Sequence, residues 1–229
     1  MPSTRRPRIL AHRGASGHAW ANSADAFRQA IELGADGVEL DVHATADGEI
    51  VVHHDPLLLD LGMIATLSAA TAREFRLPNG ERLPLLSEAL EILGDHEVWV
   101  EVKALPGRFD ARLLAVLDAG PAPSRYAVHS FDQRIVRRLG RRRPELRRGL
   151  LVVDYPADAA ATLRAADAGA LWPEYPLIDR ALVEAVHRAG GEVIGWTVDG
   201  RDECRRLAAL GVDAICGNWP DRIAAALRV

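Results

Sequence analysis

Short apolar segments alternate with helical patterns along this whole chain, and that alternation constrains the fold more than any other feature of the sequence. β-Branched and aliphatic runs predict eight strands, at residues 8–11, 37–42, 98–103, 126–129, 149–153, 170–172, 193–198 and 214–216. Helical patterns follow them at 24–33, 87–93, 110–119, 132–139, 157–168, 179–188, 202–210 and 221–227. A regular β-then-α order with eight strands predicts an α/β protein, a (β/α)8 TIM barrel.

An open doubly wound sheet is the alternative that the same alternation permits. A sheet of that kind that binds a dinucleotide carries a G-x-G-x-x-G turn after its first strand. Gly14 and Gly17 follow the first predicted strand but do not form that turn. The closed barrel is therefore the expected architecture.

The regular order is interrupted at about residues 43–86, which predicts a small insertion after the second strand. Residues 50–53 can pair back on strand 37–42 across the turn Asp47-Gly48. The rest combines a short helical stretch at 68–75 with a turn at 78–80. We expect the insertion to lie over the C-terminal mouth of the barrel, where (β/α)8 enzymes hold their active sites.

The composition indicates one globular domain over residues 1–229. Hydrophobic residues make up 48% and charged residues 26% of the chain, as in ordinary soluble enzymes. The net charge of −4 argues against nucleic-acid binding, so a phosphorylated substrate would have to be held by local cations. The sequence specifies no oligomeric state.

The sequence also predicts where the protein resides. No run of about 18 or more apolar residues occurs, so no integral membrane segment is expected. Arg5, Arg6 and Arg8 are not followed by the apolar stretch of a secretory signal. Cys204 and Cys216 lie in unrelated elements, which favours two reduced thiols over a disulfide or a metal pair. These features predict a cytoplasmic protein.

Acidic residues gather on the second and third predicted barrel strands. Glu39 and Asp41 are two positions apart and share a face, as do Glu101 and Lys103. Carboxylates inside a barrel are costly unless a cation neutralises them. Because Mg²⁺ and Ca²⁺ prefer oxygen ligands, Glu39, Asp41 and Glu101 are candidate metal ligands. An ion-pair network with Lys103 or Arg13 explains the spacing equally well.

Two histidines stand at strand ends beside these carboxylates. His12 ends the first strand and is followed by Arg13, whose guanidinium suits a phosphate oxygen. His54 comes at the end of the strand in the insertion and is followed by Asp55. A lone histidine is more often structural, but this combination suits acid–base catalysis on a phosphate ester.

Other histidines and three tryptophans have weaker support. His43 continues the face of the acidic pair and is expected behind the site, and His129 ends the fourth strand without an identifiable partner. Trp172, Trp196 and Trp219 end or follow strands near the mouth. They either wall a pocket or pack the rim, and packing is the favoured interpretation for each.

Taken in order, five blocks of the chain resemble the glycerophosphodiester phosphodiesterase family, within the phosphatidylinositol-phospholipase-C-like barrel superfamily. The blocks are Ile9–Pro56, Leu83–Lys103, Ser130–Asp132, Gly195–Val198 and Gly211–Ile215. The resemblance covers nearly the whole chain. It implies a TIM barrel that hydrolyses glycerophosphodiesters to glycerol 3-phosphate and an alcohol, with Mg²⁺ or Ca²⁺.

The resemblance implies roles for the catalytic and substrate-binding candidates. His12 matches the histidine of the family's His-Arg-Gly motif and His54 that of its His-Asp motif, which form the general acid/base pair. Arg13 and Lys103 match the positive groups around the phosphate, and Trp196 an aromatic residue near the glycerol.

The resemblance also implies the metal ligands and the course of the reaction. Glu39 and Asp41 match the Glu-x-Asp ligands, and Glu101 matches the third carboxylate ligand. A glycerol hydroxyl would attack phosphorus, with one histidine as base and the other protonating the leaving alcohol. Water would then open the cyclic phosphate.

Three places depart from the family pattern. Ala21 stands where the family usually has the glutamate of Pro-Glu-Asn-Thr, and Asp60 where it has the arginine of Arg-Thr. Asn218 takes the place of the aspartate in a Thr-Asp pair. The candidate acid/base and metal residues are kept, so we expect altered substrate-facing loops around a complete chemical centre.

The same residues permit three other functions. The enzyme would act like a lysophospholipase D, or it would be a lyase that stops at the cyclic phosphate. With those loops altered, the chain would alternatively be a non-catalytic barrel that binds a phosphorylated metabolite. The apolar stretch 56–64 either favours a lipid-like alcohol or packs the insertion.

Overall fold

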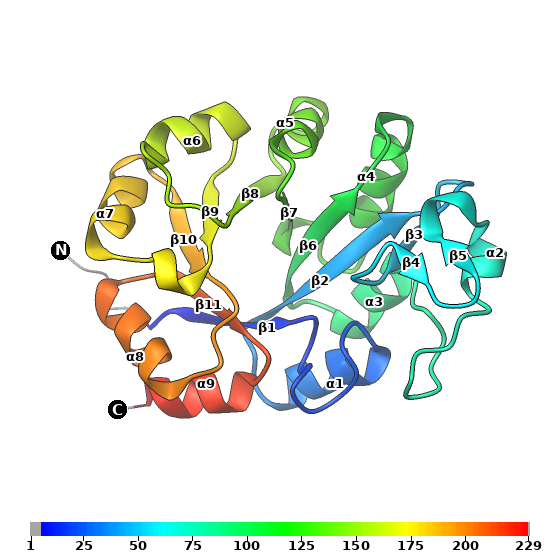
Figure 1. Ribbon diagram of the computed structural model, residues 1–229, viewed down its shortest axis with the longest axis horizontal. Helices are drawn as coiled ribbons and strands as arrows, with labels where there is room; N and C mark the ends of the chain where they lie inside the picture. Colours follow the sequence, from blue (N-terminus) through cyan, green and yellow to red (C-terminus); the bar gives the residue numbers. More distant parts are fainter. Residues whose placement is uncertain (1–5, 229) are drawn as a thin grey trace.

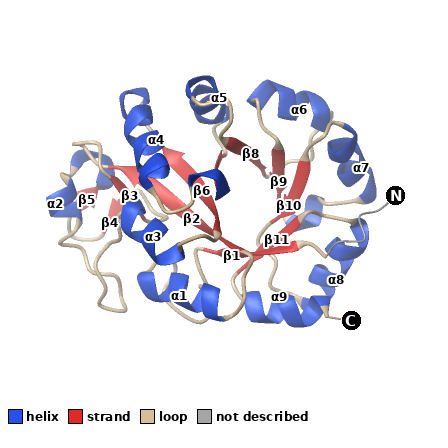
Figure 2. Cartoon of the chain, turned by 180° about the vertical axis from the view of Figure 1, so that it is seen from behind, coloured by secondary structure: helices blue, strands red, loops and turns tan. Residues whose placement is uncertain are grey.

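The computed structural model describes residues 6–228, and in it the strands form an inner ring enclosed by helices (Figures 1 and 2). Eight parallel strands form the ring: β1 (Arg8–His12), β2 (Gly37–Ala44), β6 (Glu97–Ala104), β7 (Tyr126–Ser130), β8 (Arg147–Val152), β9 (Ala170–Pro173), β10 (Glu192–Gly195) and β11 (Ala214–Gly217). The ring is closed because β1 pairs with both β11 and β2. The predicted (β/α)8 barrel is confirmed.

Helices follow the barrel strands as the sequence predicts. They are α1 (Ala24–Glu32), α3 (Leu86–Leu93), α4 (Asp110–Ala119), α5 (Gln133–Arg142), α6 (Ala159–Ala166), α7 (Arg180–Arg188), α8 (Arg201–Leu210) and α9 (Pro220–Leu227). Short 3-10 turns, η2 (Gly107–Phe109), η3 (Pro123–Arg125) and η4 (Tyr175–Leu177), lie in the connections. The helix predicted over 157–168 is shorter because Asp158 caps its first turn and Asp167 ends it in a left-handed conformation.

Alternation along each strand divides the core into an inside and an outside. On β1, Ile9 packs in the apolar layer beneath α7, α8 and α9, whereas Leu10 faces the barrel interior. The interior is filled by large residues, including Trp99 and Trp172, and by Cys216. The barrel is thus a packed core, and polar chemistry is left to the two ends of its strands.

The N-terminal end of the barrel is closed by a network of charged side chains. Arg8 donates to Glu97 and to Glu192 (2.9 Å), and Arg147 donates to Glu97 (3.0 Å). The indole of Trp99 adds a bond to Glu97 at 2.7 Å. Two arginines therefore balance two glutamates at this end.

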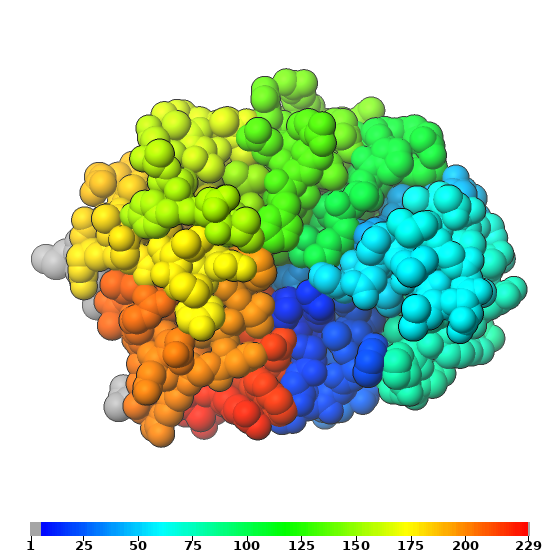
Figure 3. Space-filling model, viewed as in Figure 1, coloured from blue at the N-terminus to red at the C-terminus, as the bar shows by residue number. Residues whose placement is uncertain are grey.

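The insertion after β2 has a small core of its own. β3 (Ile50–Val52) pairs antiparallel with β2, as predicted, and is followed by β4 (Leu57–Leu58), β5 (Gly62–Met63), η1 (Ile64–Thr66) and α2 (Ala69–Ala72). Its apolar side chains pack together: Val51, Leu58, Ile64, Ala72, Leu77 and Leu83. The cyan lobe of Figure 3 lies beside the barrel. The insertion therefore flanks the mouth of the barrel, whereas the sequence leads us to expect it above the mouth.

Two expectations, on membrane segments and on the cysteines, can be compared with the described residues. No helix in residues 6–228 is long and apolar enough to cross a membrane. Cys204 and Cys216 are both free and buried. Arg5, part of the basic N-terminal start, lies outside the described residues.

Candidate active site

A cavity of about 180 Å³ opens at the C-terminal ends of the barrel strands. Its lining residues are His12, Arg13, Glu39, His54, Glu101, Lys103, His129, Phe131, Leu151, Trp172, Trp196 and Cys216. Every site residue predicted from the sequence is in this list except Asp41, which lies directly behind it. His54 is the only lining residue that comes from the insertion.

Strand register explains why residues far apart in sequence meet here. His12 of β1 is level with Glu39 of β2, and Asp41 is level with Glu101 of β6. Glu101 is in turn level with His129 of β7. Neighbouring parallel strands therefore present these five side chains at two successive levels near the top of the barrel interior.

The three carboxylates form a compact buried group. Glu39, Asp41 and Glu101 each offer an oxygen atom within 4.8 Å of the others. Lys103 Nζ lies 2.9 Å from Asp41 and 2.7 Å from Glu101, and Arg13 Nε lies 3.0 Å from Asp41. The ion-pair network considered from the sequence is therefore present, with three carboxylates and two cations.

The surplus of negative charge affects the pKa values of the carboxyl groups. Burial works against ionised Asp41, but Lys103 and Arg13 outweigh it and hold the pKa of Asp41 well below its usual range. Burial and the nearby Glu39 raise the pKa of Glu101 to about 8. The two cations thus satisfy Asp41 first, and the remaining carboxylates share too little positive charge.

The donor set fits a hard divalent cation. Glu39 Oε1 is buried and has no hydrogen-bond partner among the described residues, and the buried imidazole of His129 lies beside it, with Nε2 3.6 Å away. The other oxygen of Glu39 accepts from the backbone N–H of Arg13 at 3.1 Å. Asp41 and Glu101 each have Lys103 beside them, whereas Oε1 of Glu39 has neither a lysine nor an arginine beside it in residues 6–228. Three carboxylate oxygen donors that lack sufficient positive charge suit Mg²⁺ or Ca²⁺.

The two candidate catalytic histidines have different partners. His12 Nδ1 lies 2.8 Å from Asn218 Oδ1, and its Nε2 faces Glu39 at 3.9 Å. His54 Nδ1 lies 2.7 Å from the carboxylate of Asp55. His43 donates to the carbonyl of His54 at 3.0 Å, so it supports the loop from behind, as expected.

His129 also lines the pocket; the sequence places it near the mouth of the barrel but identifies no partner for it. It is buried against Trp99 and Trp172, and burial lowers its pKa, so its imidazole is neutral at pH 7. Neither ring nitrogen has a hydrogen-bond partner within residues 6–228. Its place at the end of β7, level with Glu101, is the signal that could have linked it to the acidic group.

One side of the pocket is apolar. Trp172 lies at its floor, and Trp196 donates from its indole to the Trp172 carbonyl at 2.9 Å. Phe131, which was not predicted, meets Trp196 edge to face at 5.6 Å. Trp219 instead packs against Arg222 outside the pocket. Trp172 both packs in the barrel core and lines the cavity, and Trp196 lines it as well, so its role beside the substrate stays a prediction.

The three residues that depart from the family pattern lie outside the pocket lining. Ala21 and Asp60 do not contribute to it. Asn22, next to Ala21, is buried and donates to Asp41 at 2.7 Å. That amide therefore braces the acidic group from the loop in which the glutamate is missing.

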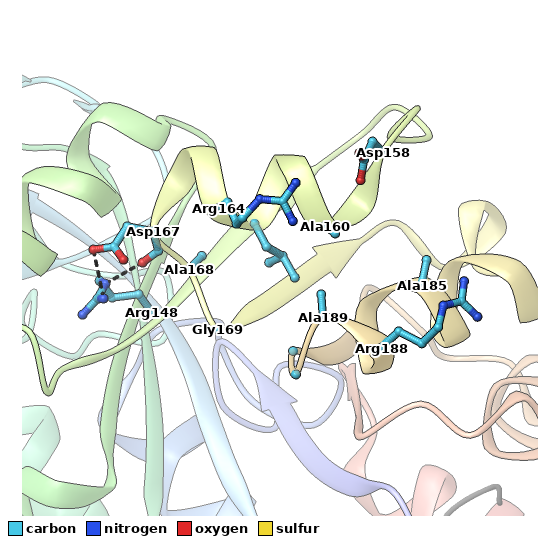
Figure 4. Close-up of a pocket in the computed structure, with 13 residues that line it drawn as sticks. Arg148, Asp158, Ala160, Arg164, Asp167, Ala168, Gly169, Ala185, Arg188 and Ala189 are labelled. Carbon is cyan, nitrogen blue, oxygen red and sulfur yellow. Dashed lines mark hydrogen bonds and ion pairs between the residues drawn. The ribbon is translucent and has the colours of Figure 1, made fainter.

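A larger hollow, of about 630 Å³, lies in the outer helical layer between α6 and α7 (Figure 4). It exists because short side chains fail to fill the space there: Ala160, Ala168, Gly169, Ala185, Ala189, Gly190 and Gly191. Arg148 at its edge is held by Asp167 at 3.1 Å. With no histidine and no carboxylate group of the kind above, it does not compete with the barrel mouth as a reaction site.

Comparisons with known proteins agree with this geometry. A family model described as the glycerophosphoryl diester phosphodiesterase family matches residues 12–222. A glycerophosphodiester phosphodiesterase of Caldanaerobacter subterraneus subsp. tengcongensis is 31% identical, over 94% of this chain and 95% of that protein.

Solved structures are similar over the same extent. A putative glycerophosphoryl diester phosphodiesterase from Silicibacter pomeroyi superposes with a TM-score of 0.90 at 25% identity, over 99% of this chain and 94% of the other. A phosphodiesterase from Oleispira antarctica, in complex with the product sn-glycerol-3-phosphate, gives 0.90 at 25% identity and 98% coverage of each chain.

Proposed function

The chain belongs to the glycerophosphoryl diester phosphodiesterase family, and from that premise we propose that it hydrolyses a glycerophosphodiester to glycerol 3-phosphate and an alcohol. The single observation that carries the proposal is the pocket itself. It gathers three histidines, two cations and an acidic group at the mouth of the barrel. The bound product in the Oleispira antarctica relative supports glycerol 3-phosphate as the product here.

The charged side of the pocket would hold the phosphate. Arg13 uses its Nε toward Asp41, which leaves the terminal N–H groups of the guanidinium for phosphate oxygens. Lys103, tied to Asp41 and Glu101, adds a fixed positive charge beside them. The apolar side, with Trp196, would take the carbon skeleton of the glycerol.

His12 and His54 would move the protons. One imidazole accepts the proton of the glycerol hydroxyl as its oxygen bonds to phosphorus, and the other donates a proton to the alcohol oxygen as its bond to phosphorus breaks. The cyclic phosphate that results is opened by water, which loses its proton to one histidine while the other protonates the released ring oxygen. Each histidine ends in the protonation state in which it began.

Glu39, Asp41 and Glu101 would hold the divalent cation, Mg²⁺ or Ca²⁺. The bound ion would offset the negative charge that builds up on the phosphate oxygens in the transition state. Before the cation binds, Lys103 and Arg13 limit the repulsion among the three carboxylates.

The direct test is the release of glycerol 3-phosphate from glycerophosphocholine and glycerophosphoethanolamine, with Mg²⁺, with Ca²⁺ and with EDTA. We expect turnover with at least one cation and none with EDTA. Phosphorus NMR of the same reactions separates a hydrolase from a lyase, because a lyase would accumulate the cyclic phosphate. No turnover of any diester would contradict the proposal and favour the phosphometabolite-binding barrel.

A lipid-like alcohol is a second candidate, favoured by the rim. The large apolar side chains that are most exposed to solvent all lie in the connections that follow the C-terminal ends of barrel strands, the insertion included: Trp20, Leu57, Leu59, Met63, Phe131, Val153 and Tyr155. Exposed apolar groups around a pocket mouth favour an amphiphilic ligand. Lysophosphatidylcholine should then be cleaved with a lower KM than glycerophosphocholine. Leu59→Ser should remove that preference, whereas equal KM values would exclude this candidate.

A further inference from the structure

Asn218, which takes the place of the family's aspartate, lies between His12 and an acidic residue outside the pocket. Its Oδ1 is 2.8 Å from His12 Nδ1. On the other side, Asp199 accepts from the backbone N–H of Asn218 at 2.7 Å and from its side-chain Nδ2 at 2.6 Å. The three side chains form a chain of hydrogen bonds that ends at a candidate catalytic histidine.

Chemistry fixes the direction of each bond in this chain. The carboxylate of Asp199 only accepts, so the amide of Asn218 must turn its NH₂ group toward it. The carbonyl oxygen of that amide then faces His12, and an oxygen of this kind cannot donate. His12 must therefore carry a hydrogen on Nδ1, whatever its protonation state. In its neutral form the lone pair lies on Nε2, the nitrogen that faces Glu39 and the pocket.

The loops that carry these residues are fastened to each other. Ser16 Oγ lies 2.8 Å from Asn218 Oδ1 and 2.7 Å from the carbonyl of His12, and the backbone of Gly17 donates to the carbonyl of Asn218 at 2.9 Å. Gly17 packs so closely on the ring of Trp219 that a Cβ would come within 2.3 Å of it. The β1–α1 and β11–α9 connections therefore move together, which keeps Asn218 in register with His12.

We propose that Asn218 is a positioning residue, which, held by Asp199, fixes the tautomer and the ring orientation of His12 so that Nε2 is the proton-accepting atom in the pocket. The proposal deepens the proposed function and rests on it. It also explains the departure at this position. An aspartate at 218 would place a second carboxylate against Asp199 at the 2.6 Å contact, so asparagine at 218 suits the aspartate at 199.

The decisive experiment exchanges the two side chains. Asn218→Asp alone sets two carboxylates face to face, and Asp199→Asn alone lets the Asn218 amide turn its NH₂ toward His12. We expect each single change to lower kcat by about 10–100-fold with KM within about twofold, the size of effect seen when a residue that orients a functional histidine is lost. The double exchange, Asp199→Asn with Asn218→Asp, restores every donor and acceptor and should return kcat to within about threefold of wild type.

A matched control and a spectroscopic readout separate positioning from folding. Asn79→Asp makes the same change at an exposed turn and should leave kcat and KM unchanged. Nitrogen-15 NMR of the wild type above pH 7, with His12→Ala for assignment, should show His12 protonated on Nδ1 and bare on Nε2. Asp199→Asn should shift it toward the opposite tautomer.

Two results would overturn the inference. The first is a neutral His12 with its proton on Nε2, and the second is a double exchange that folds but is no faster than the single variants. Absence of turnover in the wild type would instead count against the proposed function, because the NMR result tests the tautomer without any substrate.

Discussion

Glu97 and Glu101 lie four residues apart on β6, share the same face of the strand, and are both buried inside the barrel. At the N-terminal end, Glu97 receives hydrogen bonds from Arg8, Arg147 and the indole of Trp99. Burial opposes its charge, but the arginines prevail and lower the pKa of Glu97. At the C-terminal end, Glu101 faces like charges, and its pKa is raised to about 8.

The difference shows how one strand serves stability at one end and chemistry at the other. The N-terminal network is balanced, so it holds the strands together and has no capacity left for a ligand. The C-terminal group has more carboxylates than cations and an unsatisfied oxygen on Glu39, so it is completed by something that the chain does not supply. Unbalanced charge marks the functional end.

The largest effect that would sharpen this contrast is the loss of the histidines at the functional end. His12→Ala and His54→Ala should each lower kcat/KM by ~10²–10⁴-fold, because each removes a proton-transfer group. His187→Ala, at an exposed histidine paired with Asp213, is the control and should leave the rate unchanged. If either pocket variant kept more than a tenth of the activity, that histidine would have no part in the proton transfers.

The next effect concerns the unsatisfied carboxylate. Glu39→Gln keeps the shape of the side chain but removes its charge, so calorimetric titration should show markedly weaker binding of Mg²⁺ or Ca²⁺, and turnover should fall by about 100-fold. Glu91→Gln, at an exposed position on α3, serves as the matched change. Unchanged cation affinity in Glu39→Gln would break the distinction between the two ends.

At the other end, the same substitution should affect stability alone. Glu97→Gln leaves Arg8 and Arg147 with too little negative charge, so denaturant unfolding should show a loss of about 2–3 kcal/mol, while kcat of the folded enzyme stays at the wild-type value. The exposed pair of Glu184 with Arg188 offers a control, since Glu184→Gln should cost less than about 0.5 kcal/mol. A large fall in kcat for Glu97→Gln would mean that the two ends are coupled.

The smallest effect is an opposite pH dependence of the two glutamates, measured in EDTA. The folded state raises the pKa of Glu101 from 4.5 to about 8, so it binds that proton more tightly than the unfolded chain. Ionisation of Glu101 between about pH 5 and pH 9 therefore lowers the free energy of unfolding of the wild type. Relative to wild type, the free energy of unfolding of Glu101→Gln should rise by on the order of 1–3 kcal/mol as the pH increases across this range. A constant difference between the two proteins would contradict the raised pKa.

For Glu97 the sign is reversed. Its pKa is lowered from 4.5, so its contribution is complete above that value and is lost as the pH falls through the lower folded value. The deficit of Glu97→Gln should therefore shrink in acid. If it were the same at pH 3 as at pH 7, the arginines would not be acting through the charge of Glu97.

The order of strands and helices could be read from the sequence because each element has its own local pattern. The eight barrel strands appear within a few residues of their predicted places, and the hairpin across Asp47-Gly48 is present. Capping residues such as Asp179 could also be predicted from the sequence, since a cap acts on its own helix. The position of the insertion was harder, because its packing depends on contacts with the side of the barrel.

The sequence by itself determined the barrel, the family, and the residues that gather at its mouth, because alternation along a strand and the β-then-α order are local properties. Only the tertiary structure decided which of them touch. That His129 faces Glu39, that Lys103 serves both Asp41 and Glu101, and that Asn218 holds His12 depend on strand register and on the meeting of loops more than 200 positions apart. Such contacts arise when the barrel closes, and no local pattern encodes them.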